Sequence, residues 1–576
     1  MNSWTLKQKY ARLMDGEEGA IRKAWTEAAT VCLAYPNAYR TGMSNLGYQV
    51  VYALLNERPD WICERTFLPD PGDEGFFSPG STPLFSLESQ RPLTDFDLLA
   101  FSVSFENDYP NILKILDMAR IPLSASQRGD RDPLVIGGGV ALTLNPEPLA
   151  PFFDLFLLGE GEEMLQEFMD VYGAARRERL SREETLRKIQ EEIPGAYVPS
   201  LWQVRYGPDS RISGMEPVLP GLPGRVAVRR VREIGRFATE QVISTAGTEF
   251  GEMFLTEVSR GCGRGCRFCA AGYLYRPPRF RPPEVLLPSI ERGIAQGRKI
   301  GLLGTAVSDH PDLRFLCRAI LERGGRAAIG SLRLDRLDAE MADLLAKSGV
   351  ETVSLAPEAG TQRLRNVIRK GIDEDQILGA AEALIARGIS NLRLYFMTGL
   401  PTETDDDVEA IIELTRSVQH RALASSQGKR RFRRLTLSLN QFIPKPATPF
   451  QWHPLEDVRT VQRRIRRIVQ AFRKERAVTV LSDLPKWNYV QALLSLGDRR
   501  TADILLAVHR SGGNWTESLK AVNVNPDFYV YRRKAPDEIL PWSFIDHGVP
   551  VDLLRREYRD ALAGWAPPEE WGAAGW

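Results

Sequence analysis

The sequence predicts an α/β fold with three parts: an N-terminal doubly wound sheet, a central partial (β/α)6 barrel and a small, mainly helical C-terminal domain. The chain of 576 residues is too long for a single core. In two separate regions, short apolar runs alternate with amphipathic stretches at helical spacing, which is the pattern of parallel β/α units. From residue 456 onwards this alternation gives way to helical, basic sequence.

Residues 1–30 are expected to form a polar helical leader, and residues 31–175 the doubly wound sheet. Apolar runs such as VCLAYP, DLLAFSVS, PLVIGGG and DLFLLGEG are separated there by helical patterns. The glycines Gly137, Gly138 and Gly139 follow one predicted strand, and GEGEE begins a helix after another. Both segments lie at carboxyl ends of strands, where such sheets bind their ligands.

Residues 176–250 are rich in Pro and Gly and predict a linker with some β structure. Between 251 and 455 the alternation returns with MFLTEVSR, KIGLLG, RAAIGSLRL, ETVSLAPE, NLRLYFMTG and LTLSLNQFIP. These are about six β/α units, enough for a partial barrel whose reactive groups gather after the strands. Residues 456–576 are expected to form the C-terminal helical domain.

The composition is that of an ordinary globular protein, with 43% hydrophobic and 26% charged residues. A net charge of +1 gives no overall attraction to nucleic acid or membrane. The N-terminus is polar, and no apolar run reaches the ~18 residues of a spanning helix, so we expect a cytoplasmic protein without a transmembrane segment. Cys32, Cys63 and Cys317 are scattered, which favours a reducing compartment and buried, structural thiols.

The stretch SRGCGRGCRFCAAGYLYRPPRF, residues 259–280, directly follows the first predicted barrel strand and holds Cys262, Cys266 and Cys269 in a C-x3-C-x2-C spacing. Structural zinc is disfavoured because it needs four ligands and the nearest histidine is His310. Iron-sulfur clusters usually take four cysteine thiolates, so three would leave one iron open. With a low-potential electron, an open iron can drive reductive bond cleavage, as S-adenosylmethionine and Fe-S cofactors do together.

This motif, with Phe268 before its last cysteine, resembles that of the radical S-adenosylmethionine (radical SAM) superfamily. The resemblance implies an oxygen-sensitive [4Fe-4S] cluster on the three cysteines, with S-adenosylmethionine chelating the fourth iron. It also implies reductive cleavage to methionine and a 5'-deoxyadenosyl radical. Catalytic side chains beyond the cofactor ligands stay unassigned.

The resemblance extends to cofactor contacts. Residues 332–371 look like the third and fourth barrel strands, which makes Arg333 and Glu358 candidates for the S-adenosylmethionine carboxylate and ribose; an exposed arginine and a helix-capping glutamate are the alternative. Residues 391–408, including Met397, are similar to the segment along the adenine. The usual GGE is replaced by LLGTAVSD, where Thr305, Ser308 or Asp309 would make the contact to the amino group.

The N-terminal segment resembles the Rossmann-like domain of the cobalamin-binding branch of this superfamily. Its motif, Asp-x-His-x-x-Gly, supplies a histidine to cobalt, yet the first histidine of this chain is His310. Either cobalamin binds without that ligand, or the domain is a vestigial scaffold. The C-terminal sequence GDRRTADILLAVHRSGG is similar to that of a bacterial family with this architecture, a degenerate cobalamin-binding-like domain and no assigned substrate.

The predicted function is radical SAM chemistry, either cobalamin-dependent methylation or another radical modification. A methylthiotransferase is disfavoured because only Cys32 and Cys63 precede the motif. A flavodoxin or ferredoxin would serve as reductant, and the substrate is a small molecule, a lipid or RNA. Basic runs at 428–435 and 463–476 could bind phosphates or simply be solvated, and Trp487, Trp515 and Trp542 could stack on bases or fill a core. The alternative function is an Fe-S protein for electron transfer or redox sensing.

Overall fold

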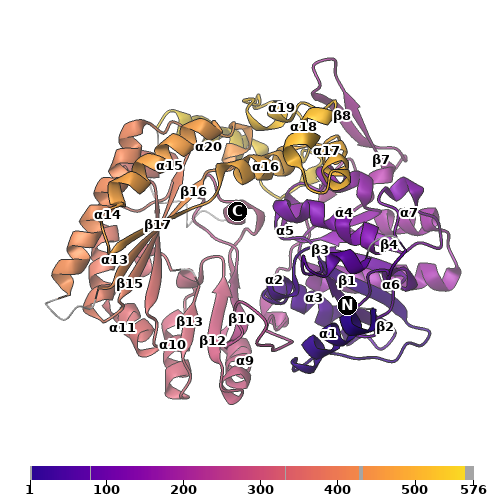
Figure 1. Cartoon of the computed structure of the whole chain (residues 1–576), viewed down its shortest axis with the longest axis horizontal. Helices are drawn as coiled ribbons and strands as arrows, with labels where there is room; N and C mark the ends of the chain where they lie inside the picture. The colour runs from indigo at the N-terminus through magenta and orange to yellow at the C-terminus, as the bar shows by residue number, and fades with distance from the viewer. Residues whose placement is uncertain (1–2, 78–79, 331, 427–431, 565–576) are drawn as a thin grey trace.

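The computed structural model describes residues 3–77, 80–330, 332–426 and 432–564. The N-terminal sheet and the barrel lie side by side, and the C-terminal helices lie across both (Figure 1). Among the described helices, none combines the length and hydropathy that a membrane crossing requires. The α/β class and the parallel sheets that the sequence predicts are confirmed.

The N-terminal sheet has the strand order β2-β1-β3-β4-β5-β6. Its strands are β1 (Ala29–Tyr35), β2 (Trp61–Phe67), β3 (Leu98–Ser102), β4 (Leu134–Gly138), β5 (Leu155–Leu157) and β6 (Ala196–Tyr197). Only β6 runs antiparallel to its neighbour. The order reverses between β1 and β3, so the loops after these two strands border the switch point where doubly wound sheets bind ligands.

Helices cover both faces of this sheet. The helices α3 (Leu46–Glu57), α6 (Gly161–Glu178) and α7 (Arg182–Glu192) pack on one face, and α4 (Tyr109–Met118) packs on the other. Because alternate residues of a strand serve opposite faces, Leu33 belongs to the first core and Cys32 to the second. This double burial explains the continuous apolar runs of the sequence. Cys32 and Cys63 are buried, as expected.

Two segments differ from their expected roles. The leader is helical only in α1 (Ser3–Asp15), after which Glu17 enters the domain and pairs with buried Arg65 at 2.6 Å. The expected linker contributes α7 and β6 to the N-terminal domain, because Leu186 and Ile189 of α7 bury against the sheet. Its remainder forms a hairpin of β7 (Trp202–Tyr206) and β8 (Ile212–Pro217), and β9 (Val226–Ala227), which pairs with β18 (Ile545–Asp546).

The barrel strands form two sheets that share one core, and all are parallel to their neighbours except the short β11 (Arg279–Phe280). Its strands are β10 (Met253–Arg260), β12 (Lys299–Gly304), β13 (Ala327–Ile329), β14 (Thr352–Glu358), β15 (Asn391–Thr398), β16 (Arg434–Gln441) and β17 (Val478–Ser482). Its main helices are α9 (Pro283–Ala295), α10 (Leu313–Glu322), α11 (Ala339–Lys347), α13 (Glu374–Ala386), α14 (Asp405–Ser425) and α15 (Val458–Phe472). The six predicted strands are present, and Cys317 is buried in α10.

The structure adds α15 and β17 to the barrel, beyond the boundary expected at residue 455. The strand β17 pairs in parallel with β16, and Ile465 and Ile468 of α15 enter the barrel core. The arginine-rich sequence of α15 conceals this role, because only one side of the helix is apolar.

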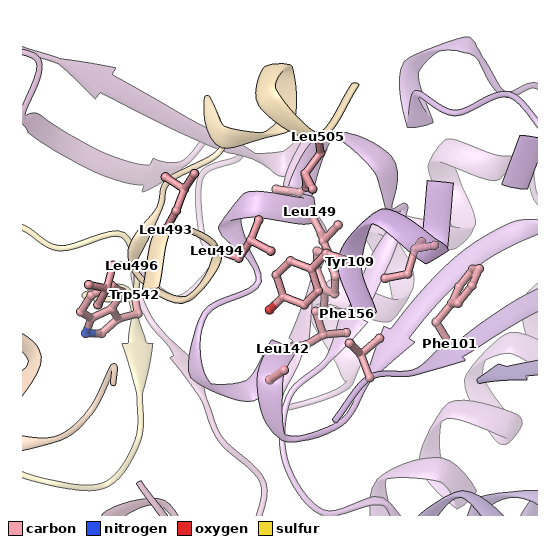
Figure 2. Packing of buried hydrophobic residues seen from close by; sticks show 14 of the residues in the cluster. Phe101, Tyr109, Leu142, Leu149, Phe156, Leu493, Leu494, Leu496, Leu505 and Trp542 are labelled. Atoms are coloured by element: carbon pink, nitrogen blue, oxygen red, sulfur yellow. The ribbon is translucent and has the colours of Figure 1, made fainter. Parts of the chain in front are cut away.

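The C-terminal helices share a core with the N-terminal domain rather than forming a separate one. They are α16 (Pro485–Leu496), α17 (Thr501–Arg510), α18 (Trp515–Ala521), α19 (Pro526–Val530) and α20 (Val551–Leu562). Figure 2 shows Leu494 and Leu505 from these helices beside Tyr109 and Leu149 of the N-terminal domain. The C-terminal helices therefore pack on the N-terminal domain and also lie across the barrel.

Candidate functional site

The three cysteines lie in one loop between β10 and α8 (Ala271–Leu274). Gly261 turns the chain with a φ of 87°, and a Cβ there would lie 2.0 Å from the carbonyl oxygen of Tyr275. The loop closes with a hydrogen bond from the Cys269 amide to the Cys266 carbonyl. All three cysteines are largely buried, and none forms a disulfide.

The three thiols are close enough to influence one another's pKa. Burial raises the pKa of Cys262, and raises that of Cys269 to about 11, while negative charge on Cys266 raises both further. Thiolates this close to one another need compensating positive charge, which a metal centre supplies. Among the described residues, no group of three or more His, Cys, Asp or Glu is arranged to hold a single metal ion.

Arg267 and Glu557 anchor the cysteine loop. The guanidinium of Arg267 is fully buried and donates to Glu557 of α20 at 2.9 Å and to the Val367 carbonyl at 2.9 Å. Glu557 also accepts from Arg369 at 3.0 Å. The C-terminal helix thus joins the cysteine loop to the segment after β14, across 290 residues of sequence. Phe268 turns toward the large core that the C-terminal helices share.

Arg333 lies beside the cysteine loop. Its guanidinium pairs with Asp335 at 2.9 Å, and its amide donates to the Ser308 hydroxyl at 3.0 Å. Arg264 of the cysteine loop pairs with Asp309 at 2.9 Å and lies 3.3 Å from Asp335. The charges of Arg333 and Asp309 reach Cys262, where they act on the thiol pKa in opposite directions. Two of the three proposed substitutes for GGE, Ser308 and Asp309, are thus near the loop, while Thr305 is exposed.

Glu358 and Lys370 form a largely buried ion pair at the end of β14. The ammonium of Lys370 donates to Glu358 at 3.0 Å. Glu358 has a φ of 67°, a strained conformation for a residue with a side chain, and such strain clusters at functional sites. Burial opposes the charged form of Lys370, but Glu358 and the thiolate of Cys266 raise its pKa, so the lysine lies near the cysteine loop. Met397 is buried on β15, where it pairs with Asn440 of β16.

Sequence reasoning missed Lys370. The signal was a lysine directly before Gly371 in the IRKG turn, within the segment already compared with the fourth barrel strand. Its neighbourhood with Cys266 arises only from folding, because 104 positions separate the two in the chain.

A second feature is a cavity of about 300 Å³ inside the N-terminal domain. It lies between α3, α6 and the carboxyl ends of the strands, and its walls are mostly apolar or glycine. The lining includes Gly137, Gly138 and Gly139, the run that the sequence singled out. Tyr275, six residues after Cys269, also lines it. The segment that follows the cysteine loop and α8 thus lines the cavity.

A buried ionic network surrounds the junction between cavity and cysteine loop. Glu160, at the start of α6, is paired with Arg279 at 2.6 Å and with Arg260 at 3.1 Å. Arg260 also pairs with Glu162 and Glu257. Burial raises the pKa of the Tyr275 hydroxyl to about 12, and Arg260, Glu160, Glu257 and Arg279 also act on it electrostatically. The network fixes the N-terminal domain against the first barrel strand.

After β1 the chain reads Asn37-Ala38-Tyr39-Arg40-Thr41-Gly42 and enters α2 (Tyr39–Met43), so a tyrosine stands where Asp-x-His-x-x-Gly has its histidine. The hydroxyl of Tyr39 donates to Glu17 at 2.6 Å. Asn37 donates to Asp108 at 2.8 Å, and burial raises the pKa of Asp108 to about 6. Asp108 follows β3, so these residues lie at the two strand ends of the switch point.

Two family models match this chain. "Radical SAM proteins, N-terminal" matches residues 47–199, and "Radical SAM superfamily" matches residues 256–415. Together they span more than half of the chain and contain the cysteine loop, Arg333 and Glu358.

Among curated proteins, the chain is 28% identical over 479 residues to the uncharacterized protein MJ0966 of Methanocaldococcus jannaschii, covering 82% of this chain and 90% of that one. It is 25% identical over 173 residues to the tRNA-2-methylthio-N(6)-dimethylallyladenosine synthase of Bacillus licheniformis, covering 28% of this chain and 34% of that enzyme. The chain thus spans about a third of the length of that enzyme.

Among solved structures, the radical S-adenosylmethionine methyltransferase TsrM of Kitasatospora setae, with cobalamin and a [4Fe-4S] cluster bound, is 17% identical with a TM-score of 0.47. The match covers 72% of this chain and 75% of that one. The cobalamin-dependent S-adenosylmethionine radical enzyme OxsB is 16% identical with a TM-score of 0.49, covering 77% and 62%.

The second model begins inside β10 and includes all three cysteines. Its family implies a [4Fe-4S] cluster and S-adenosylmethionine as cofactors. By these matches, the chain belongs to the radical SAM superfamily.

Proposed function

We propose that this protein is an enzyme that binds a [4Fe-4S] cluster through Cys262, Cys266 and Cys269 and cleaves S-adenosylmethionine reductively. One observation carries the proposal. Three largely buried thiols share a loop at the carboxyl end of β10, with the cationic groups of Arg333 and Lys370 nearby. That edge of a β/α barrel is where reactive groups gather.

The residues present fit these cofactors. Thiolates are the ligands of Fe-S clusters, and the positive charge of iron would deprotonate thiols whose pKa burial has raised. When bound, the cluster supplies the electron that splits S-adenosylmethionine into methionine and a 5'-deoxyadenosyl radical.

The neighbouring side chains would orient S-adenosylmethionine. Arg333 and Lys370 offer cations to its carboxylate, and a guanidinium can do so with two parallel hydrogen bonds. The carboxylate of Glu358, held by Lys370, can accept hydrogen bonds from ribose hydroxyls. Burial of this ion pair strengthens its polar contacts by excluding water.

We further propose that the cavity of the N-terminal domain holds the nucleotide tail of cobalamin and that the reaction is a methylation. Its volume lies at the lower end of the range of small-molecule sites, about 300–1,000 Å³. Apolar walls and glycines suit a flat aromatic ring. The described lining contains no histidine, so cobalt would lack a protein imidazole. Without cobalamin, the domain would be a vestigial scaffold and the reaction another radical modification.

The test is anaerobic reconstitution with iron and sulfide, followed by dithionite and S-adenosylmethionine. Formation of 5'-deoxyadenosine is expected, and flavodoxin or ferredoxin should replace dithionite. A reducible cluster that leaves S-adenosylmethionine intact would instead identify an electron-transfer or redox-sensing protein. Protein produced with hydroxocobalamin should retain the visible absorbance of cobalamin after gel filtration.

A further inference from the structure

The outer face of α15 carries a stripe of exposed basic residues. Arg459, Arg463 and Arg466 lie on one side of the helix, over about 10 Å of its length. Arg473, Lys474 and Arg476 follow directly. We call these six residues the α15 basic stripe. None of them forms an ion pair with another described residue.

Other arginines of the same helix have structural partners. Arg464 is buried and binds Glu403 at 2.8 Å, and Arg467 pairs with Glu409 at 2.7 Å on the side of α14. The arginines of α15 are therefore of two kinds. Arg464 and Arg467 form ion pairs with other parts of the barrel, and this is the first set. The exposed arginines of the stripe face solvent and form the second set. Ion pairs within the barrel explain the first set, whereas they do not explain the stripe.

Two exposed apolar side chains lie next to α15, just after the carboxyl end of β17. Leu484 is 66% exposed and Trp487 is 42% exposed, and the ammonium of Lys486 lies 5.4 Å from the Trp487 ring centroid. Trp515 and Trp542, in contrast, are buried in the shared core. The strand β17 is the edge of its sheet, and its carboxyl end shares an edge with Glu358 of β14. Helix α15 packs against both β17 and α16.

We propose that an unpaired nucleic-acid strand binds along the α15 basic stripe and stacks a base on Trp487, so that it reaches the open edge of the barrel. Guanidinium groups pair with phosphates, and exposed aromatic rings beside cations are platforms for bases. An acidic protein would satisfy the arginines but leave the Trp487 ring without a flat partner. The role of this strand as substrate rests on the proposed function, whereas its binding does not.

The experiment measures fluorescence anisotropy of labelled 20-nucleotide single strands, one RNA and one DNA, with the cluster-loaded enzyme at several salt concentrations. The two strands identify which nucleic acid is preferred. Binding by R459E/R463E/R466E should be at least tenfold weaker, with a salt slope lower by about 2, since each contact to a single strand contributes about 0.7. W487A should bind about tenfold more weakly with an unchanged slope.

The control is R131E/R177E/R187E, which reverses three exposed arginines of the N-terminal domain and should bind normally. Equal losses in the control, no binding of either strand, or displacement by polyglutamate as effective as by polyuridylate would overturn the proposal. Circular dichroism establishes that the variants are folded. If 5'-deoxyadenosine forms but no strand binds, only this inference fails; if strands bind but no cleavage occurs, only the proposed function fails.

Discussion

Both terminal nitrogens of Arg279 donate hydrogen bonds to the carboxylate of Glu160, at 2.8 and 2.6 Å. Arg279 belongs to β11 (Arg279–Phe280), which pairs with β10 after the cysteine loop, and Glu160 precedes α6 beside the N-terminal cavity. Both side chains are almost fully buried. This bidentate pair therefore fixes the distance between the two candidate cofactor sites.

Removing one partner of this pair should destabilise the protein. In Arg279→Ala the buried carboxylate of Glu160 loses its bidentate partner and keeps Arg260 at 3.1 Å, so the loss should be at most that of an uncompensated buried charge, about 3–5 kcal/mol. Urea unfolding followed by circular dichroism measures the loss. The control is Arg236→Ala, because this exposed arginine lies 4.0 Å from Glu163 and should contribute less than about 1 kcal/mol. Equal effects in both variants would contradict a structural role for the pair.

Each cluster ligand should be individually essential. Replacing Cys262, Cys266 or Cys269 by alanine removes one of three anchors, so iron content after reconstitution and 5'-deoxyadenosine formation should fall together. Cys317→Ala serves as the control, since that thiol is buried in α10 away from the loop. A variant that keeps its iron and its cleavage activity would show that the replaced cysteine is not a ligand.

Lys370 should contribute to cofactor binding rather than to cluster assembly. Lys370→Met removes a cation and leaves Glu358 without its partner. Because a hydrogen bond to a charged group is worth about 1.5–3 kcal/mol, the Kd of S-adenosylmethionine should rise about tenfold or more at unchanged iron content. Anaerobic isothermal titration calorimetry measures the Kd. Lys347→Met, at an exposed position of α11, should bind normally; an unchanged Kd in Lys370→Met would remove this lysine from the site.

A mutation that fills the cavity should abolish cobalamin binding without affecting the cluster. Val51 lines the cavity from α3, so Val51→Trp should fill it and abolish retention of cobalamin. Cleavage of S-adenosylmethionine by the cluster should persist in this variant. Val50→Trp changes the neighbouring residue, which does not line the cavity, and should retain cobalamin absorbance. Unchanged retention in Val51→Trp would place the cobalamin tail elsewhere.

Local patterns were sufficient to predict the sheets and the cysteine loop. The apolar runs of the N-terminal strands are continuous because Leu33 and Cys32 face two different cores, and the loop motif needs only eight consecutive residues. The strand β17 escaped prediction because most of its residues are exposed and an arginine-rich helix precedes it. Its membership of the barrel follows from pairing with β16, which no local pattern encodes.

Contacts between distant segments could not be predicted either, because no local sequence pattern encodes them. Arg267 and Glu557 are each ordinary charged residues in the sequence, and only folding brings them to 2.9 Å. The shared core of the C-terminal helices and the N-terminal sheet likewise requires two apolar surfaces to meet. The cysteine spacing alone was enough to predict a chemistry for the loop, whereas the contacts that support the loop depend on tertiary packing.

Lys534 should make the stability of the protein depend on pH in alkaline solution. Its ammonium is buried and donates to the Tyr529 carbonyl at 2.8 Å, and burial lowers its pKa from 10.5 to about 7. Between these values the unfolded chain binds more protons than the folded one, so stability rises with pH by up to about 1.4 kcal/mol per pH unit. The destabilisation is complete below pH 7 and disappears above pH 10.5.

Lys534→Met removes this titration, so its stability advantage over the unmodified protein should shrink by about 2–3 kcal/mol between pH 7 and pH 9. Urea unfolding at the two pH values measures the difference. Lys520→Met, at an exposed position of α18, should follow the unmodified protein at both. If Lys534→Met also runs parallel to the unmodified protein, the ammonium is charged in the folded state at both pH values. Its desolvation would then be offset by contacts other than the Tyr529 carbonyl.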